Sequence, residues 1–171
     1  MAGLKTEGQR VFYVKGPFNV PLDASKKSKW VNKPGPSFWD SVGDDRLKPG
    51  VFIFAVRAGK GWSTIYVGRT FKSFEKEAFT DHKLNKYNAG LNTIVIGTPC
   101  LFLVVHPPGK TNENLIKEVE TWLIHTAYAK NPKKLKNKKK LPKYKWNIEG
   151  VLRTPQTKPT KGASQLRACI F

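Results

Sequence analysis

The chain has 171 residues, 39% of them hydrophobic, and its 31 lysine and arginine residues against 12 aspartate and glutamate residues give a formal net charge of +19. This is enough for one domain with a hydrophobic core, whereas two cysteines exclude a disulfide framework, and no apolar run reaches the roughly 18 residues of a membrane span. Because so large a basic excess is self-repulsive, it indicates a polyanionic partner, with nucleic acid as the leading candidate and solubility or a ribosome-associated tail as alternatives.

Residues 1–49 are expected to form an irregular N-terminal extension that packs on the core. Within it, hydrophobic residues at Val11, at Tyr13 and over 18–22 are candidates for short edge strands. A proline-glycine turn then precedes the short capped helix that we expect over 37–42.

A β-hairpin is predicted next. Residues 51–56 are continuously apolar and β-branched or aromatic, as in a buried strand, and a glycine turn at 59–61 follows. Residues 63–67 alternate in character, as a paired strand does, so the two segments are expected to pair as a hairpin.

Two helices and a further strand complete the expected core. Apolar residues at helical spacing predict a helix over 73–85 with Ser73 as its N-cap, followed by a loop at 88–90 and a buried strand over 99–106. The clearest helix spans 112–130. Its apolar stripe comprises Leu115, Ile116, Val119, Trp122, Leu123 and Ala127. The order of elements predicts an α+β fold, a small antiparallel β-sheet flanked by helices, with N-terminal and basic C-terminal extensions.

A lysine-rich segment, 133–145, follows the second helix and is expected to border the cleft. Its lysines would track a phosphate backbone without reading sequence, unless they are merely solvated. The predicted nucleic-acid-binding residues are Lys72, Lys133, Lys134, Lys136, Lys138, Lys139, Lys140, Lys143 and Lys145. Tyr144 and Trp146 are candidates for stacking on an unpaired base, with a core position as the alternative for Trp146. Residues 151–171 are predicted to form a basic C-terminal arm.

Two glycine-containing motifs lie on the strands of the predicted hairpin, Gly50-Val51-Phe52 on the first and Tyr66-Val67-Gly68 on the second. Four polar residues follow in order along the chain: Arg69, His82 near the end of the first predicted helix, Glu120 within the second, and Asn147. In order and spacing this set, which covers roughly residues 50–148, resembles the GIY-YIG nuclease family.

The resemblance implies a GIY-YIG-like nuclease domain over residues 50–150. It also implies a divalent-metal-dependent DNA endonuclease of the restriction, phage-defence or mobile-element type. Phosphodiester hydrolysis needs a nucleophilic water, a proton acceptor and charge stabilisation on the phosphate, typically by a metal ion and a cationic side chain. The family implies that Tyr66 organises the nucleophile, that Glu120 binds one Mg²⁺ or Mn²⁺ ion, and that Asn147 supports the site.

Glu120 also stands out on helical geometry. At about 100° per residue, the apolar stripe centres near Val119 and Leu123, and Glu120 lies at its edge. A carboxylate at the margin of a buried face indicates a pocket or a metal, with an ordinary solvated glutamate as the alternative. For Tyr66 the alternative is a strand tyrosine whose hydroxyl finds any partner, and for His82 it is a structural histidine.

Two positions depart from the family pattern. Phe52 has no hydroxyl where the first motif carries tyrosine, and the expected helix arginine falls on Lys76 or Glu77. Lys76 supplies a positive charge without the bidentate fork of arginine, and Arg69 is a nearby arginine that could reach the site.

Two hypotheses therefore stay open. The favoured one is an active nuclease with its chemistry rearranged, and its predicted catalytic residues are Tyr66, Arg69, Lys76, His82 and Asn147, with the metal on Glu120. The other is a catalytically impaired GIY-YIG-like nucleic-acid-binding or interaction module. A ribosomal or purely structural basic protein is a third class, which leaves the ordered motifs unexplained.

The expected partner is nucleic acid, DNA rather than RNA on the resemblance alone, and no membrane. Residues 1–49 are candidates for a homodimer or protein-partner surface. The first ten residues hold no apolar signal region, and Cys100 sits in an apolar run as a buried thiol would, so we expect a reducing, cytoplasmic setting. His106 and His125 are interpreted as structural or surface residues.

Overall fold

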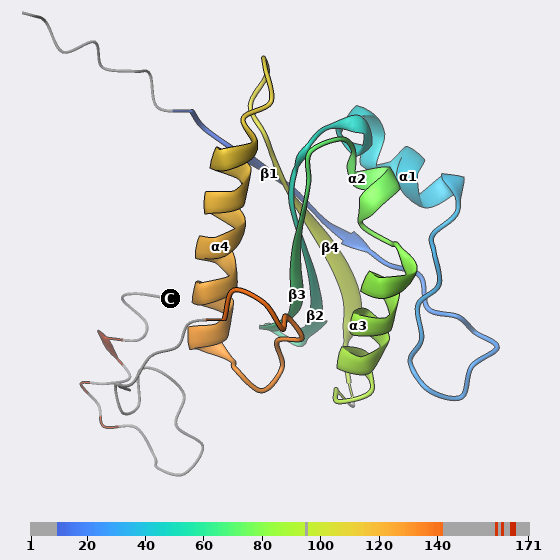
Figure 1. Cartoon of the computed structure of the whole chain (residues 1–171). Coiled ribbons are helices and arrows are strands. Elements are labelled where there is room, and N and C mark those ends of the chain that lie inside the picture. The colour runs from blue at the N-terminus through green and yellow to red at the C-terminus, as the bar shows by residue number, and fades with distance from the viewer. Residues whose placement is uncertain (1–9, 95, 142–159, 161, 163–164, 167–171) are drawn as a thin grey trace, which may run out of the picture.

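The computed structural model describes residues 10–94, 96–141, 160, 162 and 165–166. Its elements follow in this order: β1 (Tyr13–Asn19), α1 (Pro36–Val42), the 3₁₀ helix η1 (Gly43–Leu47), β2 (Gly50–Ala58), β3 (Gly61–Thr70), α2 (Phe74–Glu77), α3 (Asp81–Leu91), β4 (Thr98–Val105) and α4 (Glu113–Lys130) (Figure 1). An antiparallel sheet with helices on both faces confirms the predicted α+β class.

The four strands form one antiparallel sheet in the order β1-β4-β2-β3, so β1 and β3 are its edges. The predicted hairpin is present as β2 and β3, with strands longer than expected because pairing continues as far as Gly50 opposite Thr70. This register places Phe52 directly opposite Gly68 and so brings the two glycine motifs together. At the other edge, β1 pairs with β4, which confirms an edge strand around Tyr13.

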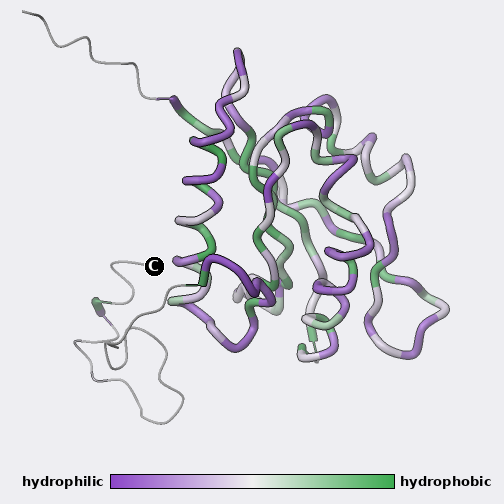
Figure 2. Tube along the Cα trace, in the orientation of Figure 1, coloured by the Kyte–Doolittle hydropathy of each residue, from purple (hydrophilic) through white to green (hydrophobic). Residues whose placement is uncertain are grey.

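Alternation along β2 divides the interior into two hydrophobic clusters, one on each face of the sheet. Phe52 and Phe54 belong to the cluster that α1, α2 and α3 cover, whereas Val51 and Ile53 belong to the cluster under α4. Because β2 is buried on both faces, its sequence is continuously apolar instead of alternating. Figure 2 shows this apolar character along the central strands between the two helical layers.

The segment between β1 and β2 packs on the first of these clusters, as expected for the N-terminal extension. Val31 has no exposed surface and Trp39 of α1 is 3% exposed. Asn88 of α3 holds Val31 with two hydrogen bonds, because its Oδ1 accepts the Val31 N–H at 2.8 Å and its Nδ2 donates to the Val31 carbonyl at 3.0 Å. Residues before β2 are therefore part of the same packed core as the sheet.

The prediction of one helix over 73–85 is wrong, because this region forms two helices, α2 and α3, with a break at 78–80. Ser73 caps α2 as predicted, since its Oγ accepts the N–H of Lys76 at 3.4 Å. The loop predicted at 88–90 is also wrong, because those residues lie within α3.

The break between α2 and α3 is buried against the core. Ala78 and Phe79 are both buried, at 0% and 2% exposure, and Thr80 is extended with φ −69° and ψ 155°, so the chain changes direction there before α3 begins. The hydroxyl of Tyr87 donates to the Ala78 carbonyl at 2.6 Å, which satisfies a backbone group left without a helical partner where α2 ends.

The boundaries of α4 agree with the prediction to within one residue, but its buried face differs. Ile116, Glu120 and Ile124 are the buried residues of this helix. Trp122, predicted within the apolar stripe, is 65% exposed. Residues four apart lie above one another on a helix, whereas a residue two positions away points to the opposite side. Glu120 consequently lies in the middle of the buried face, not at its edge.

Two further predictions concern cysteine and membranes. Cys100 lies in β4 with no exposed surface and is a free thiol, as predicted, whereas Cys169 lies outside the described residues. Within the described part of the chain, no helix combines the length and apolar character needed to cross a membrane.

Candidate active site

After α4 the chain returns along the edge of β3 as an extended segment, which we call the strap (residues 134–140). The backbone N–H of Lys136 donates to the carbonyl of Ile65 at 2.6 Å. The side chain of Asn137 acts like a further strand, since its Oδ1 accepts the N–H of Val67 at 3.0 Å and its Nδ2 donates to the Val67 carbonyl at 2.8 Å. These bonds satisfy edge groups of β3 and fix the strap beside it.

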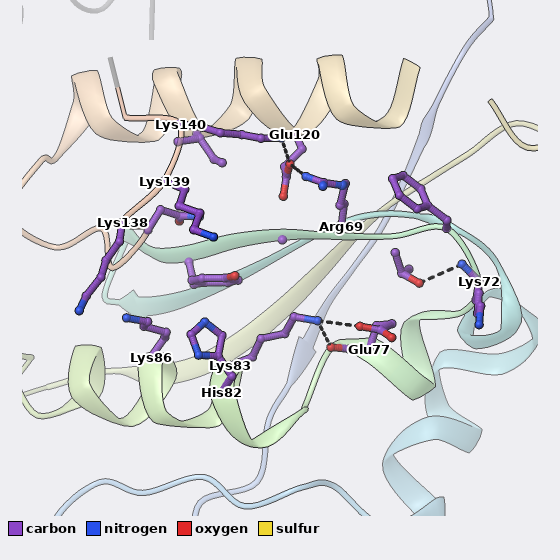
Figure 3. A pocket seen from close by; sticks show the side chains of 16 residues that line it. Arg69, Lys72, Glu77, His82, Lys83, Lys86, Glu120, Lys138, Lys139 and Lys140 are labelled. Atoms are coloured by element: carbon purple, nitrogen blue, oxygen red, sulfur yellow. Dashed lines mark hydrogen bonds and ion pairs between the residues drawn. The ribbon is translucent and has the colours of Figure 1, made fainter. Parts of the chain in front are cut away.

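A cavity of about 590 Å³ lies between the strap and α4 on one side and α3 on the other, with β3 as its floor (Figure 3). Seven of its lining side chains are cationic: Arg69, Lys72, Lys83, Lys86, Lys138, Lys139 and Lys140. Two are carboxylates, Glu77 and Glu120. This excess of positive charge in a concave surface focuses a potential that attracts anions.

Glu120 lies in the α4 wall of this cavity with 7% of its surface exposed. Its Oε2 forms two ion pairs, one with the guanidinium of Arg69 from β3 and one with Nζ of Lys140 from the strap at 2.5 Å. These partners lie 51 and 20 residues away in the sequence, so the fold brings them together. Burial penalises a lone carboxylate, and the two cations offset that penalty. Glu120 is therefore not a solvated surface glutamate.

Tyr66 lines the same cavity from β3. Its ring centroid lies 6.5 Å from that of Phe52 and 5.7 Å from that of Tyr87. Burial raises the pKa of Tyr66, the negative charge of Glu120 raises it further, and Arg69 partly opposes this. The phenol therefore stays protonated at neutral pH, and it is suited to donate a hydrogen bond instead of accepting a proton.

The two glycine motifs are packed against each other with almost no free space. A Cβ at Gly68 would lie 2.5 Å from Cζ of Phe52 and 2.9 Å from Cε1 of Tyr66, so a larger residue would displace both rings. Phe52 has no exposed surface, and its ring stacks beside that of Tyr66. The position that carries tyrosine in the GIY-YIG pattern is thus a buried hydrophobic residue here.

The α3 wall of the cavity contributes Lys83 and Lys86, which were not predicted from the sequence. Nζ of Lys83 donates to the carbonyl of Glu77 at 2.5 Å and to its Oε2 at 3.1 Å. Lys76, predicted to replace the family's arginine, is exposed and does not line the cavity. Of α2 only its last residue, Glu77, lines the cavity, whereas the lysines of this wall come from α3.

The other predicted residues divide into three groups. Those that line the cavity are Tyr66, Arg69, Lys72, His82, Glu120, Lys138, Lys139 and Lys140. Those that do not line it are Lys133, Lys134 and Lys136, and Nζ of Lys134 donates instead to the carbonyl of Thr93 at 2.6 Å. Those that lie outside the described residues are Lys143, Lys145 and Asn147.

An asparagine that the sequence reasoning missed, Asn137, supports the cavity by fixing the strap. It is 9% exposed, and Leu135 two residues earlier is 7% exposed. Burial at alternate residues is the period of an extended strand, and these two positions interrupt the run of lysines at that period. The pattern was therefore present in the sequence.

His106 and His125 have structural contacts, in agreement with their interpretation. Nε2 of His106 accepts the N–H of Asn112 at 3.1 Å, and its Nδ1 lies 2.6 Å from the carbonyl of Pro107, so the ring ties β4 to the start of α4. Nε2 of His125 lies 2.9 Å from the carbonyl of Lys140 and holds the end of the strap against α4.

The predicted metal ion must be judged by the donors that the cavity offers. Among the described residues, no group of three or more histidine, cysteine, aspartate or glutamate side chains is arranged to hold a metal ion. Mg²⁺ commonly binds one or two carboxylates and completes its coordination with water and substrate phosphates. Both ion pairs of Glu120 involve Oε2, so Oε1 forms no ion pair with a described residue. The cavity thus fits a metal that binds together with a phosphate.

No family model, curated protein or solved structure matches the chain. The structure therefore defines the protein only as an α+β protein with a four-stranded antiparallel sheet between two helical layers and a cationic cavity that contains one buried carboxylate.

Proposed function

We propose that the protein binds nucleic acid in this cavity and hydrolyses phosphodiester bonds there with the help of one divalent metal ion. This proposal rests on the observation that Tyr66, Arg69 and Glu120 line one cavity whose other charged groups are mostly lysines. The same three residues belong to the set that resembles the GIY-YIG nucleases, and DNA is the substrate that this resemblance favours.

In this proposal Arg69 and Lys140 bind the reacting phosphate. Both pair with Glu120, so an incoming phosphate competes with that carboxylate for them. Fixed cations next to the phosphate stabilise the negative charge that develops in the transition state. When they turn to the phosphate, the carboxylate of Glu120 becomes available as a ligand for Mg²⁺ or Mn²⁺, whose role when bound is Lewis-acid activation.

Tyr66 and His82 are the remaining groups that fit a part of the reaction. Because its pKa is raised, Tyr66 donates a hydrogen bond and orients either the attacking water or a phosphate oxygen. His82 lies exposed at the cavity wall formed by α3, where its imidazole can accept the proton of that water as it attacks phosphorus. One P–O bond forms and another breaks, and the leaving oxygen takes a proton from solvent.

A second candidate, binding without hydrolysis, is favoured by two observations. Phe52 is fully buried and offers no hydroxyl where the family pattern carries one. The carboxylate of Glu120 is already neutralised by two cations, as in a purely structural ion-pair cluster. Under this candidate the cavity holds a phosphate backbone through charge alone.

The test is incubation of the full chain with supercoiled plasmid in Mg²⁺, in Mn²⁺ and in EDTA. Glu120→Gln is compared with Glu118→Gln, an exposed glutamate on the same helix. We expect metal-dependent nicking that Glu120→Gln abolishes and Glu118→Gln retains, with plasmid binding preserved in both. A salt-sensitive gel shift with no cleavage by the wild-type chain would instead establish the binding candidate.

A further inference from the structure

The cationic side chains of the cavity fall into two sets. Arg69, Lys83 and Lys140 each pair with a carboxylate, either Glu77 or Glu120. Lys72, Lys86, Lys138 and Lys139 form no ion pair with a carboxylate in the described residues. Figure 3 shows Lys86 and Lys138 side by side at the opposite end of the cavity from Lys72. These two lysines are therefore an unpaired group distinct from the Arg69–Glu120–Lys140 cluster.

Both lysines are held in place by rigid neighbours. Lys86 precedes Tyr87, whose ring is fully buried and stacks on Phe54 with a centroid distance of 4.0 Å. Lys138 follows Asn137, which is fixed to β3 by its two hydrogen bonds. The backbone is thus fixed at both positions, and the two side chains, from α3 and from the strap, extend into the same end of the cavity.

Two ammonium groups at close range repel each other. Loss of hydration, followed by the charge and hydrogen bonding of Lys138, lowers the pKa of Lys86. An anion between two such groups converts a repulsive pair into two attractive ones. A site made of point charges with no fork geometry fits a phosphate and reads no base sequence.

We propose that Lys86 and Lys138 form a second phosphate-binding site, which takes a phosphate next to the reacting one in a nucleic acid strand that lies along β3. This inference rests on the proposed function, because the first phosphate is the one at Arg69 and Lys140. A strand of repeating phosphates accounts for both sets of cations in one cavity, whereas a single free phosphate accounts for only one.

The test measures binding of the full chain to a fluorescent oligonucleotide in EDTA over a series of KCl concentrations. Lys86→Gln/Lys138→Gln is compared with Lys60→Gln/Lys110→Gln, which removes the same charge from exposed loops outside the cavity. Loss of one phosphate contact reduces the slope of log K against log [salt] by about one unit. We expect that reduction in the cavity variant and none in the loop variant, and equal slopes in the two would overturn the inference.

A second arm identifies the phosphate itself. Oligonucleotides with one neutral methylphosphonate linkage, moved position by position, weaken binding wherever a contacted phosphate is lost. In the Lys86→Gln/Lys138→Gln variant, a methylphosphonate at one linkage should no longer weaken binding, whereas those at the other linkages should weaken it as in the wild-type chain. The reason is that the lysine pair and that one phosphate form a single coupled contact. If every position keeps its wild-type effect, the lysine pair binds no strand phosphate.

Two controls separate this inference from the proposed function and from a free ion. If plasmid cleavage depends on Glu120 but the cavity and loop variants have equal salt slopes, the second phosphate site alone is refuted. If the wild-type chain binds no oligonucleotide, both the second site and the proposed function are refuted. Acylation of lysine amines, read by mass spectrometry, should show Lys86 and Lys138 protected by the oligonucleotide. Equal protection by inorganic phosphate at the same phosphate concentration would overturn the assignment to a strand.

Discussion

Two carboxylates of the protein, Asp45 and Glu120, have similar surroundings. Their side chains are 13% and 9% exposed, and each pairs with two cations. Oδ1 of Asp45 lies 2.8 Å from Nζ of Lys48, its Oδ2 lies 3.6 Å from Nζ of Lys15, and the hydroxyl of Tyr13 donates to Oδ1 at 2.9 Å. A tyrosine, Tyr13 or Tyr66, thus accompanies each carboxylate.

The difference lies in what surrounds each cluster. At Asp45 the polar groups satisfy one another, because the hydroxyl of Tyr13 also accepts a hydrogen bond from Lys48 at 2.8 Å. Beside Glu120, Tyr66 makes no hydrogen bond to a described residue, and the cluster opens on a cavity with further lysines. A carboxylate with two cations is therefore not in itself a site. Open space and unbalanced positive charge beside it distinguish the candidate active site from a structural tie.

The largest expected effect is on cleavage. Glu120→Gln should lower metal-dependent cleavage by about a hundredfold or more, because it removes the carboxylate that would hold the metal. Asp45→Asn should leave cleavage unchanged and lower the free energy of unfolding by roughly 1–3 kcal/mol, because charged hydrogen bonds are lost. Plasmid cleavage rates and urea unfolding measure the two effects. Equal losses of activity in the two variants would show that Glu120 acts through stability.

Substitution of Tyr66 and of Tyr13 should also separate an effect on cleavage from an effect on stability, with smaller magnitudes. Tyr66→Phe should reduce cleavage by about tenfold to a hundredfold, because one hydrogen-bond donor to the reacting groups is removed, with little change in stability. Tyr13→Phe should lower the free energy of unfolding by about 1 kcal/mol and leave cleavage intact. Single-turnover cleavage and urea unfolding are measured on both variants. A stability loss confined to Tyr66→Phe would reverse the roles assigned to the two clusters.

A substitution in the strap tests whether its attachment to β3 organises the cavity. Asn137→Ala removes two hydrogen bonds to Val67 and should lower stability by roughly 1–3 kcal/mol. It should also weaken oligonucleotide binding, because the lysines of the strap are no longer positioned. Asn114→Ala, an exposed change on α4, is the control. Faster hydrogen exchange at the Val67 amide without any loss of binding would show that the strap does not organise the nucleic acid site.

The smallest effect is the acid response of Asp45. Burial alone would raise the pKa of Asp45, but hydrogen bonds from Lys48 and Tyr13 outweigh it and hold the pKa below its usual 3.8. A carboxyl group whose folded pKa is depressed stabilises the fold above its unfolded pKa, and that stabilisation is lost as the pH falls through the folded value. The free energy of unfolding should therefore fall more steeply below pH 3.8 in the wild-type chain than in Asp45→Asn. Parallel pH profiles would contradict this.

Local patterns were enough for much of the fold. The apolar run of β2, its pairing with β3 and the span of α4 follow from periodicity over neighbouring residues. Periodicity failed at α2 and α3, because the apolar spacing continues across a break where Thr80 is extended. It also failed for Trp122, whose exposure depends on the way α4 lies against the sheet.

For the site, the sequence alone named Tyr66, Arg69 and Glu120 as candidates, because they belong to an ordered set of motifs on predictable elements. Only the tertiary structure decided their partners. The hydrogen bonds between Asn137 and Val67 connect residues 70 apart, and the ion pair of Arg69 with Glu120 spans 51 residues. Local spacing does not encode such contacts, since they depend on how the edge of the sheet, α4 and the strap pack together.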